Sequence, residues 1–143
     1  MMKSNRGFSL LELLIVVAII LIIATIAIPS FLRSRQAANE SSAATSLRVV
    51  NTAEVSYLST GGVYGSVTDL VTAGLLDNRF STPMSGYVVS ITLSVDAMDY
   101  TSYATAIGVN DGKYDFYSRP DYVIRYSAVP SRAPTGLTGE PVR

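Results

Sequence analysis

The chain has 143 residues, 11 basic and 11 acidic side chains, and no Cys, His or Trp. These absences exclude disulfides, Cys/His zinc sites and the Cys–His and Ser–His pairs of nucleophilic catalysis, so no catalytic residue and no cofactor are predicted. The balanced charge predicts no binding to nucleic acid. The length allows one small domain, and the composition favours a structural or binding protein over an enzyme.

The N-terminal part of the chain is dominated by a long apolar segment. Residues 8–28 read FSLLELLIVVAIILIIATIAI, interrupted only by Ser9, Glu12 and Thr25. A run of about 20 apolar residues can cross the hydrocarbon core of a membrane as a helix. A secretory signal peptide would have a shorter apolar core that ends at a small-residue cleavage site. An uncleaved signal anchor fits the length but leaves the carboxylate of Glu12 unexplained.

The position of Glu12 suggests that the chain is processed. A carboxylate inside a membrane segment costs a few kcal/mol and needs a partner. Arg6 lies six residues earlier, so it does not share a helical face with Glu12. Cleavage after Gly7 would create a charged amino group on Phe8, about one helical turn before Glu12. The two charges could then pair within one chain or between neighbouring chains.

Residues 7–13, GFSLLEL, resemble the prepilin cleavage and methylation motif of type IV pilins and type II secretion pseudopilins. The resemblance continues to Pro29. It implies that a prepilin peptidase/methyltransferase cleaves between Gly7 and Phe8 and N-methylates Phe8. It also implies that Glu12 recruits the Phe8 amine of a neighbouring subunit and sets the register of assembly.

The same resemblance implies partners and a location. The partners are other copies of the chain in a helical filament, the processing enzyme, an inner-membrane assembly platform, and membrane lipid before assembly. The precursor would cross the inner membrane once. The assembled subunit would lie in an extracellular pilus or in a pseudopilus that spans the periplasm.

A second helical segment follows the apolar one. Residues 30–59 contain neither Pro nor Gly and are rich in Ala, which favours a helix that ends at Gly61. Ala43, Leu47 and Val50 recur at helical spacing and predict an apolar stripe. Pro29 removes a backbone donor and predicts a kink where the two segments meet.

Charged residues interrupt this second segment at five positions. Each is interpreted either as part of a solvated helix face or as one half of a salt bridge between subunits. The five are Arg33, Arg35, Glu40, Arg48 and Glu54.

The sequence after the second helical segment predicts a small head made of a short helix and several strands. Residues 67–76 (VTDLVTAGLL) suggest the helix. Residues 87–95 alternate apolar and polar side chains as a half-buried strand does, and 103–109, 114–117 and 123–127 suggest further strands. Asn110-Asp111-Gly112 predicts a tight turn. The expected fold is therefore α+β, with the long N-terminal helix packed on an antiparallel β-meander of three or four strands.

Acidic residues in the head raise the question of a metal site. Five of them lie in or near predicted turns, where Asp is common for conformational reasons. No spacing matches an EF-hand loop, so calcium is the weaker interpretation and no metal ligand is assigned. The five are Asp96, Asp99, Asp111, Asp115 and Asp121.

The predicted organisation has five parts: a leader (1–7), a transmembrane and assembly helix (8–29), an amphipathic helix (30–60), a globular α+β head (61–129) and a coil tail (130–143). The preferred function is a structural subunit of a type IV pilus-like filament. A pseudopilin or minor pilin is the first alternative. An anchored binding module that never polymerises is the second, and an anchored enzyme is the least favoured.

Overall fold

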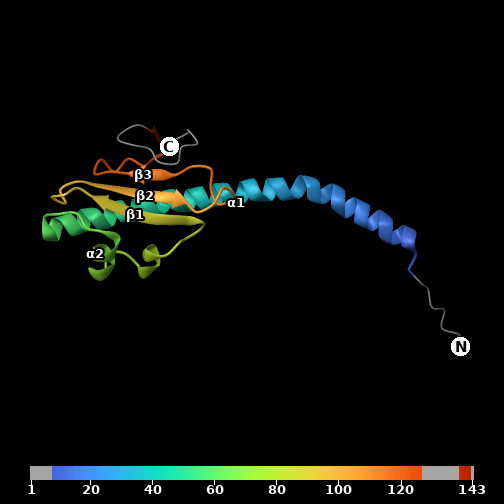
Figure 1. The fold of residues 1–143 in the computed structure, drawn as a ribbon, viewed down its shortest axis with the longest axis horizontal. Coiled ribbons are helices and arrows are strands. Elements are labelled where there is room, and N and C mark those ends of the chain that lie inside the picture. Colours follow the sequence, from blue (N-terminus) through green and yellow to red (C-terminus); the bar gives the residue numbers. More distant parts are fainter. Residues whose placement is uncertain (1–7, 127–138, 143) are drawn as a thin grey trace, which may run out of the picture. The chain divides into compact units, whose positions relative to one another are not determined.

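The computed structural model describes residues 8–126 and 139–142 (Figure 1). The predicted leader, including Gly7, and most of the predicted tail lie outside the described residues. The chain divides into two compact units, residues 1–34 and residues 35–143. Helix α1 (Leu10–Gly61) contributes to both.

In the first unit, α1 is an apolar helix with its side chains exposed. It is long and apolar enough to cross a membrane, with a mean hydropathy of 3.1 over its most apolar 18 residues, none of which is buried. Pro29 lies inside the helix. Because proline has no N–H, it cannot donate to the carbonyl of Thr25, and the kink expected there remains a prediction.

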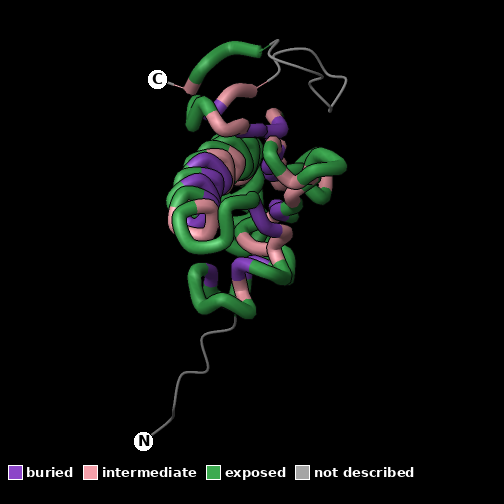
Figure 2. Tube along the Cα trace, turned by 90° about the vertical axis from the view of Figure 1, so that its left-hand side faces the viewer, coloured by how far each residue is buried: buried purple, intermediate pink, exposed green. Residues whose placement is uncertain are grey.

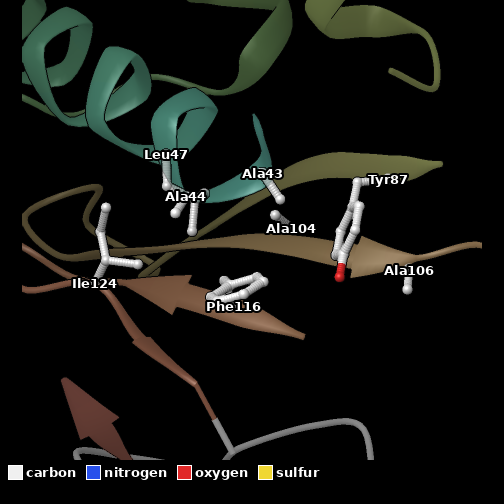
Figure 3. Close-up of a cluster of buried hydrophobic side chains, with 8 residues drawn as sticks. All are labelled: Ala43, Ala44, Leu47, Tyr87, Ala104, Ala106, Phe116 and Ile124. Carbon is white, nitrogen blue, oxygen red and sulfur yellow. The ribbon is translucent and has the colours of Figure 1, made fainter. Parts of the chain in front are cut away.

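In the second unit, α1 packs one face against a sheet. From the adjacent pair Ala43 and Ala44 onward, its buried apolar residues recur every three or four positions, so they share one side of the helix. Ala43, Ala44 and Leu47 meet Tyr87, Ala104, Ala106, Phe116 and Ile124 in one core cluster (Figure 3). Val50 and Ala53 continue the stripe into a second cluster with Leu70, Leu76, Phe80 and Val89. The distribution of buried residues along the chain is drawn in Figure 2.

Two short helical elements connect α1 to the sheet. The chain leaves α1 at Gly62, whose φ of +71° suits glycine. Helix α2 (Val67–Thr72) starts with a capping box, in which Ser66 and Asp69 each accept the other's backbone N–H. Helix η1 (Asn78–Ser81) follows and was not predicted. Its Phe80 is buried in the second core cluster.

The sheet has five antiparallel strands in the order β1-β2-β3-β4-β5. Its long pair is β1 (Tyr87–Leu93) with β2 (Tyr100–Ala106), in the register Tyr87 opposite Ala106. Three short strands complete it: β3 (Phe116–Ser118), β4 (Arg125–Tyr126) and β5 (Glu140–Pro141). The α+β fold with a helix on an antiparallel meander is therefore confirmed.

Several predicted boundaries were wrong. The predicted helix 67–76 ends at Thr72, because the chain turns at Gly74 with a φ of +73°. The second strand begins at Tyr100 rather than Tyr103 and ends before Gly108. The predicted coil tail contributes β5, so the sheet has five strands rather than the three or four expected. Pro141 is tolerated there because β5 lies at the sheet edge.

Candidate assembly site

The carboxylate of Glu12 lies in the first turn of α1 and is engaged locally. Its Oε2 accepts the backbone N–H of Ser9 at 3.0 Å. This contact forms half of a capping box, and a negative charge is favourable at this end of a helix. Ser9 directly follows Phe8, so the carboxylate lies beside the residue whose amine cleavage would free. Gly7, on the other side of that bond, lies outside the described residues.

The surface around Glu12 is apolar and unburied in a single copy. Phe8, Leu10 and Leu11 are 75%, 80% and 64% exposed. Further along, the large aliphatic side chains of residues 13–28 are also exposed. Exposed apolar surface of this extent indicates a membrane or a protein partner.

The loop between β2 and β3 is fastened to α1 by three side chains of the second unit. Gln36 Nε2 donates to the carbonyl of Val109 at 2.9 Å, and Asn39 Nδ2 donates to the carbonyl of Asp111 at 2.8 Å. Glu40 Oε1 accepts the N–H of Lys113 at 2.7 Å. These contacts satisfy backbone groups of the loop that the sheet ladders do not pair. The loop is therefore fixed on the helix.

Glu54 differs from every other charged residue of α1 because it is completely buried. Its Oε2 accepts the N–H of Gly65 at 3.0 Å, while Oε1 has no hydrogen-bond partner among the described residues. Burial raises the pKa of Glu54 to about 7, the N–H of Gly65 lowers it, and the charge of Asp69 raises it. The carboxyl group is therefore neutral below pH 7.

The prediction of a solvated face or a salt bridge was wrong for Glu54. Residues 47, 50 and 54 share one side of a helix, so the spacing of the apolar stripe placed position 54 in the core. Glu40 is half-buried on the β2–β3 loop. Arg33, Arg35 and Arg48 are exposed, and none forms an ion pair within the described part of the chain.

A polar network beside Glu54 also escaped the sequence analysis. Tyr100 OH donates to Asn51 Oδ1 at 2.9 Å, and Asn51 Nδ2 donates to Ser118 Oγ at 2.8 Å. All three residues are buried. The network joins α1 to β2 and β3 through satisfied polar groups, which restricts the helix to one register on the sheet.

The five acidic residues of the head are dispersed. Asp99 pairs with Arg119 and Asp121 with Arg125, each at 2.7 Å. Asp115 is buried and accepts the N–H of Ala106. Within residues 8–126 and 139–142, no three carboxylates gather in a way that could hold a metal ion.

Two of the matches to known proteins cover a limited part of the chain. Residues 2–28 match the family model described as the prokaryotic N-terminal methylation motif. The chain is 51% identical over 55 residues to the type IV major pilin protein PilA of Myxococcus xanthus, a match that covers 38% of this chain and 25% of that protein. The chain thus spans about a quarter of the length of that relative.

A second relative matches along most of the chain. It is the type IV wide pilus major component PilA4 of Thermus thermophilus, 31% identical over 121 residues, which cover 84% of this chain and 86% of the relative. The chain belongs to the type IV pilin family. This pilin is thus a member of a structural family and not of an enzyme family. The motif around Glu12, found from the sequence, is the part of the pilin that the family model recognises.

Proposed function

We propose that this pilin is a filament subunit, cleaved between Gly7 and Phe8, N-methylated at Phe8 and polymerised through the apolar half of α1. The main support is the similarity, along most of the chain, to a major pilus component. Both relatives are named as major pilins, which favours this function over a pseudopilin or minor pilin. Before assembly, the exposed apolar helix is held by membrane lipid, and a prepilin peptidase and an inner-membrane assembly platform act on it.

Glu12 sets the register of assembly in this proposal. In the precursor its carboxylate is occupied by the Ser9 N–H. Once Phe8 carries a free amine, the carboxylate gains a cationic partner that is buried with it. Helix association in an apolar environment depends on packing and on polar contacts, because burial of apolar surface gains little there. A single charge pair therefore selects one axial offset between neighbouring helices.

The proposal is tested by two variants that separate charge from hydrogen bonding. Glu12→Gln keeps an acceptor for the Ser9 N–H but removes the charge, whereas Glu12→Ala removes both. Cleavage should remain intact in both variants. Filament yield should fall about tenfold or more in both. Loss of a contact that contributes about 1.4 kcal/mol to association lowers the association constant by a factor of ten.

Filament yield and the mass of the processed chain in membranes are the two readouts. Normal filament yield from Glu12→Gln would show that the charge of Glu12 does not set the register. Retention of residues 1–7 in wild-type chains, in cells with an active peptidase, would contradict processing. The precursor would then be an anchored module.

A further inference from the structure

Two apolar patches lie at opposite ends of the head. The tip patch consists of Val95 and Met98, in the turn before β2. The base patch consists of Ile107 and Val109, in the loop after β2. Val95 is fully exposed, Met98 is 61% exposed, and Ile107 and Val109 are 57% and 75% exposed. The seven residues of β2 separate the patches by about 23 Å.

Hydrogen bonds place each patch at one end of the second unit. The carbonyl of Ala97, inside the tip turn, accepts the N–H of Tyr64, just after α1 ends. The carbonyl of Val109 accepts from Gln36, near the start of the second unit. The patches therefore face opposite ends of the helix segment on which the sheet is packed.

The tip turn is held in one conformation. Ser94 donates its N–H to the carbonyl of Asp99 and its hydroxyl to Asp96, and the N–H of Met98 also donates to Asp96. Ala97 has a φ of +53°, a left-handed conformation that a non-glycine residue adopts at a cost. The turn thus presents Val95 and Met98 to solvent from a fixed framework, which lowers the entropic cost of binding.

The base loop is equally fixed, and its exposed charges differ in sign from those of the tip. Arg35 and Lys113 are exposed cations that form no ion pair within the described chain, whereas the nearby carboxylates of Glu40 and Asp111 are half-buried. At the tip, Asp96 is exposed, and its bonds from Ser94 and Met98 lower its pKa. Asp99 is already paired with Arg119. The exposed charges are therefore cationic at the base, where the half-buried Glu40 interacts with Lys113, and anionic at the tip.

We infer that the tip patch of one pilin docks on the base patch of a second copy, head to tail. The inference rests on the proposed filament function and adds a contact between heads to the one between helices. Two different surfaces that bind each other give an open array rather than a closed dimer, as a filament requires. With only four large apolar side chains, the contact is too small to hold two copies alone. It reinforces an assembly that the helices direct.

The absence of cysteine from the chain allows a direct test. Full-length pilins carry one Cys at position 95 or 98 and one at position 107 or 109, in all four pairings. Filaments sheared from cells are oxidised and run on non-reducing gels. Because a disulfide forms only where the Cα atoms approach to about 7 Å or less, a ladder of multimers reports the contact. The single-Cys variants and a Met98→Cys/Thr105→Cys pair, whose second site is exposed on β2, serve as controls.

The expected result is a ladder in at least one tip–base pairing and none in the controls. Filaments in normal yield without a ladder in any of the four pairings would overturn the head-to-tail contact and leave the proposed function intact. Absence of the wild-type chain from sheared filaments would contradict the proposed function itself.

A charge test on the base patch complements the cross-linking. Val109→Asp places a carboxylate where Asp96 of the next copy would approach, whereas Val109→Lys places a cation there. We expect Val109→Asp to lower filament yield several-fold relative to Val109→Lys. Equal yields from the two variants would contradict the docking of Asp96 beside this patch.

Discussion

Glu54→Gln should remove a pH dependence from the stability of the head. Glutamine keeps an acceptor for the N–H of Gly65 and adds no charge to the site. In the wild type, burial raises the pKa of Glu54 from 4.5 to about 7. This difference in pKa between the folded and unfolded states changes the free energy of unfolding by about 3 kcal/mol.

The sign of this pH dependence follows from whether the folded or the unfolded state holds the proton of Glu54. Below pH 4.5 the carboxyl is protonated in both states, so it adds no pH dependence. Between pH 4.5 and 7 the unfolded chain releases the proton while the folded head retains it, so the free energy of unfolding falls as pH rises. Above pH 7 both states are ionised, and the loss of about 3 kcal/mol is complete. The ionisable groups around Glu54 are Asp69, Tyr64 and Tyr100.

The assay is urea unfolding of the full-length pilin in detergent micelles at several pH values. Tyrosine signals report the head, because the chain has nine Tyr and no Trp. The quantity of interest is the free energy of unfolding of the variant minus that of the wild type, in which the contributions of the other carboxylates cancel. This difference should increase by about 3 kcal/mol from pH 4.5 to pH 7.5. Glu40→Gln controls for loss of another carboxylate from α1. A difference that stays constant over this range would show that Glu54 does not hold a raised pKa in the folded head.

Two further predictions concern packing in the head. Leu47 is completely buried between α1 and the sheet, so Leu47→Ala should lower the free energy of unfolding by about 2–5 kcal/mol, and a loss below 1 kcal/mol in urea unfolding would contradict its place in the core. A Cβ at Gly112 would collide with the hydroxyl of Tyr87, which donates to the carbonyl of Tyr114 at 2.6 Å, so Gly112→Ala should cost about 1–3 kcal/mol. Gly61→Ala is the matched control, since a Cβ there meets nothing within 4 Å; equal melting temperatures for the two alanine variants would refute the predicted collision.

The long helix could be predicted because its signals are local. Residues 30–59 lack Gly and Pro, and Gly61-Gly62 marks the end, where α1 in fact ends. The start of β1 at Tyr87 was equally clear from the alternation of its side chains. These signals depend on neighbours in sequence, so tertiary packing had little to change.

What escaped prediction depends on contacts between distant residues. β5 has two residues and exists only because it pairs with β4, whereas β4 lies within the predicted strand 123–127 and is shorter than predicted. No pattern of two residues can predict a strand. The burial of Glu54 could have been inferred from its place on the apolar stripe. Its contact with Gly65 could not, because that contact depends on the path of the loop after the helix.

At the candidate site the sequence supplied residue types and a motif, and the roles of Gly7, Phe8 and Glu12 stay predictions. The cost of a charge at Glu12 pointed to a partner, and the segment GFSLLEL pointed to cleavage. The two patches on the head carry no sequence motif. They flank β2 in the sequence, but their exposure depends on the turn and the loop that the fold holds in place.

Processing and filament assembly of this pilin are tested together by its intact mass in filaments sheared from whole cells. We predict an abundant species that starts at Phe8 and carries one additional methyl group. A chain that is absent from sheared filaments, and that retains residues 1–7 in membranes of cells with an active prepilin peptidase, would contradict it.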